Sequence, residues 1–412
     1  MATGDGPLEV RVPAVHDLDA YVACIEAAFS IRVPPEERER LLSGLEAGHA
    51  LAAFDSGELV GTLAGFPLEH TVPGPLLAPA LAVREVAVLP THRRRGVLSA
   101  LMRRLLDDAR GRGEALAVLF ASEATIYGRF GFGPASWACR YVVDRRDARF
   151  ARPLGDLAPG SVRLLRPGQA REAFPLVFDA VRRRRAGEVD RLAEWWDEVF
   201  EERRDEPGAQ RFHACYEQDG QIDGYALYEV PEPRGNEGRE LVVVELVTAT
   251  PAAYAALWSY LLGVDLTVRL RTLARPVDEP LRWLLEDPRA LRTSLCEDHT
   301  WVRLVDVPAA LAARRYAAVG QLVLEVEDAV CPWNSGRFSV EVAADGCAEV
   351  RRTARPADLA LDAAMLGATY LGGTSFASFA AAGRIAEHAL GAARRADALW
   401  ATDEPPFCSA DF

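Results

Sequence analysis

The segment from Val83 to Gly113 constrains the fold of this chain more than any other stretch. It opens with an apolar run from Val83 to Leu89, whose alternation predicts a β-strand. A basic turn, Arg93 to Gly96 (RRRG), comes shortly after this run. Apolar residues then recur at helical spacing and predict an amphipathic helix from Val97 to Arg112. The sequence therefore predicts a strand, a basic turn with a glycine, and a helix in close succession.

Such a succession is suited to binding phosphate. The free N–H groups at a helix start, and the dipole behind them, attract an anion, and glycine lets the backbone approach it closely. The alternative is that RRRG is only a solvated turn. Arginines beside a helix N-terminus oppose its dipole, however, so three in a row indicate an anionic partner that offsets the repulsion.

The basic turn resembles the R/Q-x-x-G-x-G/A loop of the GNAT superfamily of N-acetyltransferases, with Leu98 where Gly or Ala is usual. A second motif follows it in the chain. The apolar run from Ala115 to Ser122 predicts a buried strand, and Ile126 to Phe132 (IYGRFGF) is similar to the Y-x-x-x-G-F segment that closes the same fold. The two motifs together, in this order and at this separation, indicate a GNAT domain.

The resemblance implies a site for acetyl-CoA, in which Arg93, Arg94 and Gly96 hold the pyrophosphate. Backbone amides of the strand around Val86 and Val88 are expected to pair with the pantetheine arm, and one of them can face the oxyanion.

Tyr127 is the expected general acid. A phenol with a pKa of about 10 is well matched to a departing thiolate with a pKa of about 8.5. Ser122, just past the strand, is expected to bond the sulfur end of the cofactor. The alternative for Tyr127 is a core tyrosine whose hydroxyl is hydrogen-bonded.

The first half of this pattern recurs later in the chain. The run from Leu51 to Pro67 predicts a hairpin with a turn at Asp55-Ser56-Gly57, and the run from Phe212 to Val230 repeats it. The strand REVAVLPT then aligns with VELVTATP, which begins at Val244. Where the first copy has HRRRG, the second has PAAYA, with neither a cation nor a glycine. We therefore interpret the second copy as structural.

The remainder of the chain, from about Trp301, predicts strands and alanine-rich helices. It resembles the sterol-carrier-protein-like domain that closes the Eis (enhanced intracellular survival) acetyltransferases. The PPFC tail, which ends in Phe412, is one of the places where this resemblance is specific. In that family the domain follows an active GNAT copy and a degenerate one. The resemblance covers essentially the full chain and implies a hexamer.

The expected fold class is therefore α+β. It consists of tandem GNAT domains, each a mixed sheet flanked by helices, with the second degenerate, followed by a sterol-carrier-protein-like α/β domain. The expected boundaries are 1–150, 151–300 and 301–412.

Three carboxylates are candidates for the general base. Glu85 lies on the key strand and Glu26 in the first predicted helix. The Eis resemblance implies instead the C-terminal carboxylate of Phe412, which is anionic at neutral pH because an α-carboxyl has a pKa of about 3.5. Aromatic Phe407 and Phe412, with the stiff Pro405-Pro406 pair, can anchor such a tail. The alternative is a frayed chain end.

Composition narrows the function classes. The net charge of −13 disfavours nucleic-acid binding and favours a cationic acceptor. Seven cysteines without a C-x-x-C pair argue against a zinc site or a disulfide framework. All 47 basic residues are arginine, so Schiff-base lysine chemistry is impossible. No apolar run is long enough to span a bilayer and no signal pattern opens the chain, so we expect a cytoplasmic protein without a membrane partner.

Two functions remain. The first is an acetyl-CoA-dependent N-acetyltransferase, acting by direct attack of a primary amine through a tetrahedral intermediate on an aminoglycoside-like or lysine-like acceptor. The second is a non-catalytic carrier whose C-terminal domain binds an apolar ligand. The intact RRRG loop favours the first, because a scaffold does not need it.

Overall fold

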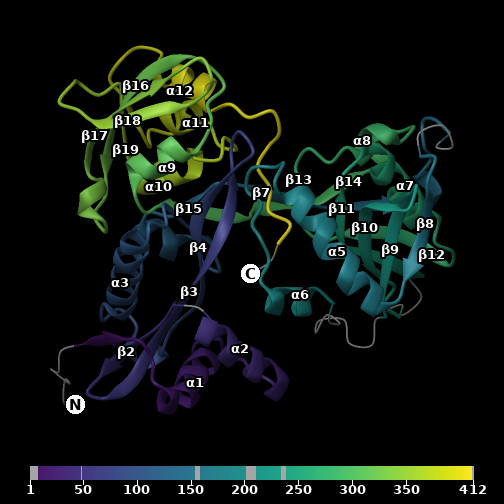
Figure 1. Ribbon diagram of the computed structural model, residues 1–412, viewed down its shortest axis with the longest axis horizontal. Coiled ribbons are helices and arrows are strands. Elements are labelled where there is room, and N and C mark those ends of the chain that lie inside the picture. Colours follow the sequence, from purple (N-terminus) through teal and green to yellow (C-terminus); the bar gives the residue numbers. More distant parts are fainter. Residues whose placement is uncertain (1–7, 48, 154–157, 201–209, 233–237, 411–412) are drawn as a thin grey trace. The chain divides into compact units, whose positions relative to one another are not determined.

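The computed structural model describes residues 8–47, 49–153, 158–200, 210–232 and 238–410 (Figure 1). These residues form two compact units. The first combines the chain up to Ala135 with residues 300–402, and the second combines residues 136–299 with the tail that begins at Asp403. In the described residues the fold is α+β with three mixed sheets, which confirms the predicted class.

The first sheet contains the organising segment, with the strand order β1-β2-β3-β4-β5-β15-β6. Only the β4–β5 pair is parallel within this order. The strands are β1 (Glu9–Arg11), β2 (His49–Asp55), β3 (Glu58–Val72), β4 (Leu76–Val88), β5 (Leu116–Phe120), β6 (Gly133–Pro134) and β15 (Thr300–Leu304). The helices of this part are α1 (Leu18–Phe29), α2 (Pro35–Ala47), α3 (Val97–Arg112) and α4 (Ala124–Tyr127).

The predicted hairpin and helix are both present. Strands β2 and β3 pair antiparallel around the turn at Ser56 and Gly57, which have left-handed φ values of 54° and 85°. Helix α3 then packs closely on β3. A Cβ on Gly61 would stand 2.6 Å from Val97 Cγ1, so glycine at this position lets the helix approach the sheet.

The sheets do not follow the boundaries expected at residues 150 and 300. Strand β7 (Trp137–Asp144) lies before the boundary expected at residue 150, yet it pairs with strands of the second unit. The place beside β5 is taken by β15, where Val302 pairs with Val118. This exchange depends on pairing between residues far apart in the chain, which local sequence patterns do not report.

The second sheet has the strand order β13-β7-β12-β11-β10-β9-β8, with β14 paired to β7. Its parallel pair is β11–β12, which corresponds to β4–β5 in the first sheet. The further strands are β8 (Ser161–Leu165), β9 (Arg211–Gln218), β10 (Gln221–Glu229), β11 (Arg239–Thr248), β12 (Thr267–Thr272), β13 (Arg275–Pro276) and β14 (Arg292–Asp298). The helices are α5 (Pro167–Arg182), α6 (Ala193–Phe200), α7 (Pro251–Gly263) and α8 (Leu281–Leu284).

The third sheet lies in the C-terminal part of the first unit, with the order β18-β17-β16-β19-β20. Its strands are β16 (Gly320–Glu327), β17 (Gly336–Val342), β18 (Ala348–Arg352), β19 (Leu359–Asp362) and β20 (Ala386–Glu387). The helices are α9 (Val307–Ala313), α10 (Ala363–Thr369), α11 (Phe376–Ala381) and α12 (Ala392–Trp400).

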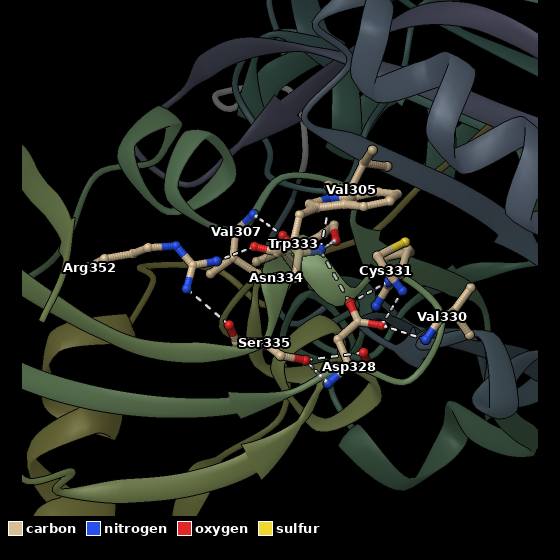
Figure 2. A network of polar contacts seen from close by, with 11 residues as sticks. Val305, Val307, Asp328, Val330, Cys331, Trp333, Asn334, Ser335 and Arg352 are labelled. Atoms are coloured by element: carbon tan, nitrogen blue, oxygen red, sulfur yellow. Dashed lines mark hydrogen bonds and ion pairs between the residues drawn. The ribbon is translucent and has the colours of Figure 1, made fainter. Parts of the chain in front are cut away.

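A buried polar network connects this third sheet to β15 of the first (Figure 2). Arg303 of β15 forms a fully buried ion pair with Asp328, at 2.5 Å. The other Asp328 oxygen accepts the Val330 and Cys331 N–H groups. Asn334 donates to the Val305 carbonyl and to Asp328, and accepts the Val307 N–H (Figure 2). The network holds the loop after β16 against the end of β15.

Removing the Asp328 carboxylate should be strongly destabilising. We expect Asp328→Ala to lower the free energy of unfolding by about 3–5 kcal/mol, because it leaves the Arg303 charge buried without its partner. The matched control is Glu325→Ala, which breaks the half-exposed Arg337–Glu325 pair and should cost about 0–1 kcal/mol. Denaturant unfolding of both variants measures the difference. Equal losses would contradict the structural role of the network.

Candidate active site

The edge of β4 that faces β5 is open over its second half. In the described residues the parallel pairing ends at Ala82 and Val118, although β4 continues to Val88. A bulge interrupts the ladder with β3 at Glu85, which has a φ of 55°. The two neighbouring strands therefore separate beyond Ala82.

The backbone N–H groups of Val86 and Val88 point toward this opening. The Glu85 carbonyl accepts the Thr62 hydroxyl of β3, at 2.8 Å, and the N–H of the same trans peptide, that of Val86, points the opposite way. Leu89 N–H donates to the Val60 carbonyl of β3, so by ladder alternation Val88 turns its N–H away from β3. The two amides that sequence reasoning selected thus both point away from β3.

The basic turn leads from this edge into α3. Gly96 is the N-cap of α3, with a φ of 84°, and no side chain caps the helix start. The space where its Cβ would stand is open, so a ligand can approach the backbone closely. The free N–H groups of the first helical turn and the helix dipole both favour an anion here.

The three arginines of the turn differ in what they contact. Arg95 pairs with Asp55 at 2.9 Å, and Arg93 donates to the Ala28 carbonyl at 3.2 Å. Arg94 is exposed and makes no hydrogen bond or ion pair with any residue that the structure describes. Its φ of 63° is unusual for a residue with a side chain. Arg94 is therefore available to an anionic ligand, whereas Arg93 and Arg95 have protein partners.

Tyr127 ends the short helix α4, which follows β5. It is buried in the same apolar cluster as Val97 of α3, and Val86 and Val88 pack against that cluster. Burial raises the pKa of the Tyr127 phenol, while a hydrogen bond with exposed Ser122 lowers it. A phenol is protonated at neutral pH even at its ordinary pKa, and the net increase leaves it so, as a proton donor requires.

The two side-chain candidates for the base both have structural neighbours. Glu26 accepts the Val33 N–H at 2.8 Å and so fixes the segment after α1. Glu85 lies at the bulge of β4, with its carboxylate 3.8 Å from Arg84. The third candidate, Phe412, lies outside the described residues. The tail that leads to it is described as far as Ala410 and packs within the second unit.

Comparisons with known proteins agree with this geometry. Models of the acetyltransferase (GNAT) domain match residues 9–135 and 187–304, and a sterol carrier protein domain matches residues 307–409. N-acetyltransferase Eis from Mycobacterium tuberculosis is 39% identical over 404 residues, covering 95% of this chain and 96% of that protein. The chain belongs to the Eis family of GNAT N-acetyltransferases.

Further relatives extend over the same length. An uncharacterized N-acetyltransferase from Streptomyces coelicolor is 38% identical over 409 residues, covering 97% of this chain and 98% of its own. The crystal structure of Eis1 from Mycobacterium abscessus superimposes with a TM-score of 0.87 at 36% identity, covering 98% of this chain and all of that one. The family membership therefore applies to both GNAT copies and to the C-terminal domain.

The second copy of this Eis-family chain differs from the first at both elements of the site. In the alignment of the two strands, Leu246 of β11 stands where β4 has Val86. The buried Arg275 side chain donates to the Leu246 carbonyl at 2.7 Å and pairs with Glu279 at 2.8 Å. A protein side chain thus bonds the strand position that is open in the first copy. Sequence reasoning missed Arg275, because nothing local marks it.

The helix start of the second copy is also closed. The Thr250 hydroxyl accepts the Ala253 N–H at 3.2 Å, and Pro251 at the first position of α7 has no N–H to offer. The N-cap of the corresponding helix in the first copy, α3, is Gly96, with no side-chain cap. These differences give a physical reason for interpreting the second copy as degenerate.

The C-terminal domain of the Eis-family chain contains a hollow of about 690 Å³. Its lining mixes apolar side chains with four charged ones, Glu325, Glu327, Asp362 and Arg384. This hollow is poorly suited to an apolar ligand, because such a ligand would bury the charged side chains without offering them hydrogen bonds or ion pairs. No helix in the described residues is both long and apolar enough to cross a membrane.

Proposed function

We propose that this Eis-family enzyme transfers the acetyl group of acetyl-CoA to a primary amine of a cationic acceptor, either aminoglycoside-like or lysine-like. The observation that carries the proposal is the open edge of β4 at Val86 and Val88, which leads into an uncapped helix start beside Arg94. The net charge of −13 favours a cationic acceptor by long-range attraction.

The residues of this site fit the parts of acetyl-CoA. The N–H groups of Val86 and Val88 can pair with the amides of the pantetheine arm, in place of the missing strand. The backbone from Gly96 and the Arg94 guanidinium can bind the pyrophosphate, with a contribution from Arg93 if it leaves the Ala28 carbonyl. One β4 amide can then face the oxyanion of the tetrahedral intermediate.

Direct attack requires a neutral amine and a protonated leaving thiol. Tyr127 supplies the second requirement, since its buried phenol is protonated at neutral pH and donates as the carbon–sulfur bond breaks. The Ser122 hydroxyl, which lowers the pKa of this phenol, is the group that we propose to bond the sulfur end of the cofactor. For the first requirement we propose the terminal carboxylate of Phe412, with Glu85 as the side-chain alternative. Glu26 is the weakest of the three candidates, because it already accepts the Val33 N–H.

The alternative function is a carrier protein. It is disfavoured by the charged lining of the C-terminal hollow and by the open β4 edge, which a scaffold would not need.

We further propose, on the family resemblance alone, a cytoplasmic hexamer. Light scattering of the purified chain measures the oligomeric state.

Calorimetry of acetyl-CoA binding tests the proposed function directly. We expect one site per chain, because Arg275 and Thr250 close the second copy. Arg94→Ala should weaken binding by about 1.5–3 kcal/mol, roughly 10- to 150-fold, through the loss of a charge-assisted hydrogen bond. Arg95→Ala is the matched control and should change affinity little, because Arg95 pairs with Asp55. Two sites per chain, or equal effects of the two variants, would contradict the assignment.

A further inference from the structure

The last residues of the chain that the structure describes are buried like those of a core strand. Phe407, Cys408 and Ala410 are only 4%, 0% and 1% exposed, although chain ends usually fray. The residues of the second unit that bond this tail are Arg185, Glu188, Arg191 and His299, and Glu245 pairs with Arg191; we call these five residues the tail seat.

The first part of the seat binds the backbone around Phe407. Arg185 donates to the Pro405 carbonyl at 2.8 Å, and Phe407 N–H donates to the Ala186 carbonyl at 3.0 Å. His299 bonds the Cys408 carbonyl at 2.9 Å, and its ring stacks on that of Phe407. A Cβ at residue 187 would stand 2.8 Å from the Phe407 carbonyl oxygen, so Gly187 is required for this contact.

The second part of the seat binds Ser409 at three points. One oxygen of Glu188, Oε2, accepts both the Ser409 N–H and the Ser409 hydroxyl, each at 2.9 Å. Arg191 donates to the Ser409 carbonyl at 2.8 Å. Burial raises the pKa of Glu188 to about 7, while the Ser409 hydrogen bonds and the Arg191 charge act in the opposite direction.

Arg191 is itself fixed by a buried pair. Its side chain and that of Glu245 are 2% and 8% exposed, and Tyr225 donates to the same carboxylate at 2.9 Å. Glu245 aligns with Glu85, the residue at the bulge of β4. The second copy therefore uses this strand position to orient a cation toward the tail.

We propose that the second GNAT copy positions the C-terminal carboxylate, with Glu188 and Arg191 as positioning residues that fix Ser409. The inference rests on the proposed role of Phe412 as the base. Ser409 is three residues before Phe412, so fixing it confines the terminal carboxylate to within about 10 Å of a defined point. The copy that has lost its cofactor site thus keeps a function in the reaction.

The buried Cys408 thiol provides a readout that does not depend on activity. Trypsin releases it in the C-terminal peptide Ala396–Phe412, where it is the sole cysteine. We expect Glu188→Ala to increase Cys408 alkylation by iodoacetamide at least tenfold and to lower kcat at least tenfold, with acetyl-CoA affinity unchanged. Glu188→Gln should retain most of the protection of Cys408 and most of kcat, because its amide oxygen can accept both hydrogen bonds from Ser409.

Two further variants control for misfolding and for nonspecific effects of a substitution in the second unit. Ser409→Pro removes both donors to Glu188 without changing a residue of the seat, and it should have the same effects as Glu188→Ala. Glu217→Gln, which alters a surface pair with Arg163 in the same unit, should leave labelling and kcat unchanged.

The outcomes separate this inference from the proposed base. Cys408 that stays protected in both Glu188→Ala and Ser409→Pro would overturn the role of the seat. Exposed Cys408 with full kcat would also overturn it. Two changes to the chain end, deletion of Phe412 and addition of a C-terminal tag, then show which proposal has failed. If those variants are inactive, only the positioning role is wrong; if they are active, the proposed base is wrong as well.

Discussion

Tyr127→Phe is expected to lower kcat about 10²–10⁴-fold while acetyl-CoA affinity stays within a few-fold. The substitution removes the hydroxyl that would protonate the departing thiolate, and general acid catalysis contributes on this scale. It leaves the ring in place, so the apolar cluster that includes Val97 keeps its packing. Steady-state kinetics together with calorimetric titration of acetyl-CoA measure both quantities.

Tyr141→Phe is the matched control for this prediction. Tyr141 is also buried, and its hydroxyl donates to the Pro276 carbonyl at 3.0 Å in the second unit. Its loss should reduce stability by about 1 kcal/mol and leave kcat nearly unchanged. If Tyr127→Phe behaves in the same way, with full kcat and a lower melting temperature, Tyr127 is a core residue and the assigned role is wrong.

Local chemistry explains why the organising segment could be predicted from the sequence. The glycine at position 96 and the helix Val97–Arg112 depend on residues close in the chain, and the structure has both where expected. The strand before them was expected from Val83 to Leu89, and in the structure it is longer at its start, from Leu76 to Val88. The hairpin at Ser56 and Gly57 is predictable for the same reason, since its turn needs left-handed φ values.

What the sequence did not predict depends on distant residues. The exchange of β7 and β15 between sheets follows from pairings such as Val302 with Val118, which no local pattern encodes. Arg275 of β13 donates a hydrogen bond to the Leu246 carbonyl of β11. Nothing in the sequence around this arginine indicates that it bonds β11. Arg93 likewise has a partner only because the Ala28 carbonyl, distant in the chain, lies beside it, whereas Arg94 has none among the described residues.

Altering the chain end should abolish turnover, with a loss of at least about 10²-fold in kcat, while folding and acetyl-CoA binding remain intact. Deleting Phe412 moves the terminal carboxylate back by about 3.5 Å of chain, which is beyond hydrogen-bond reach of an amine placed for attack. Appending a C-terminal tag converts the same carboxylate into a neutral amide. Neither change touches the Arg94 loop, so calorimetry with acetyl-CoA should be unchanged.

Two controls distinguish the carboxylate from its surroundings. Phe412→Leu keeps a carboxylate at the same position and should retain most of kcat, whereas a side-chain role for Phe412 predicts a large loss. Glu85→Gln should be nearly as active as the parent enzyme if the terminal carboxylate is the base, and inactive if Glu85 is. A tagged enzyme with full kcat would exclude the terminal carboxylate. Glu85 would then be the first residue to test, because Glu26 already accepts a backbone N–H.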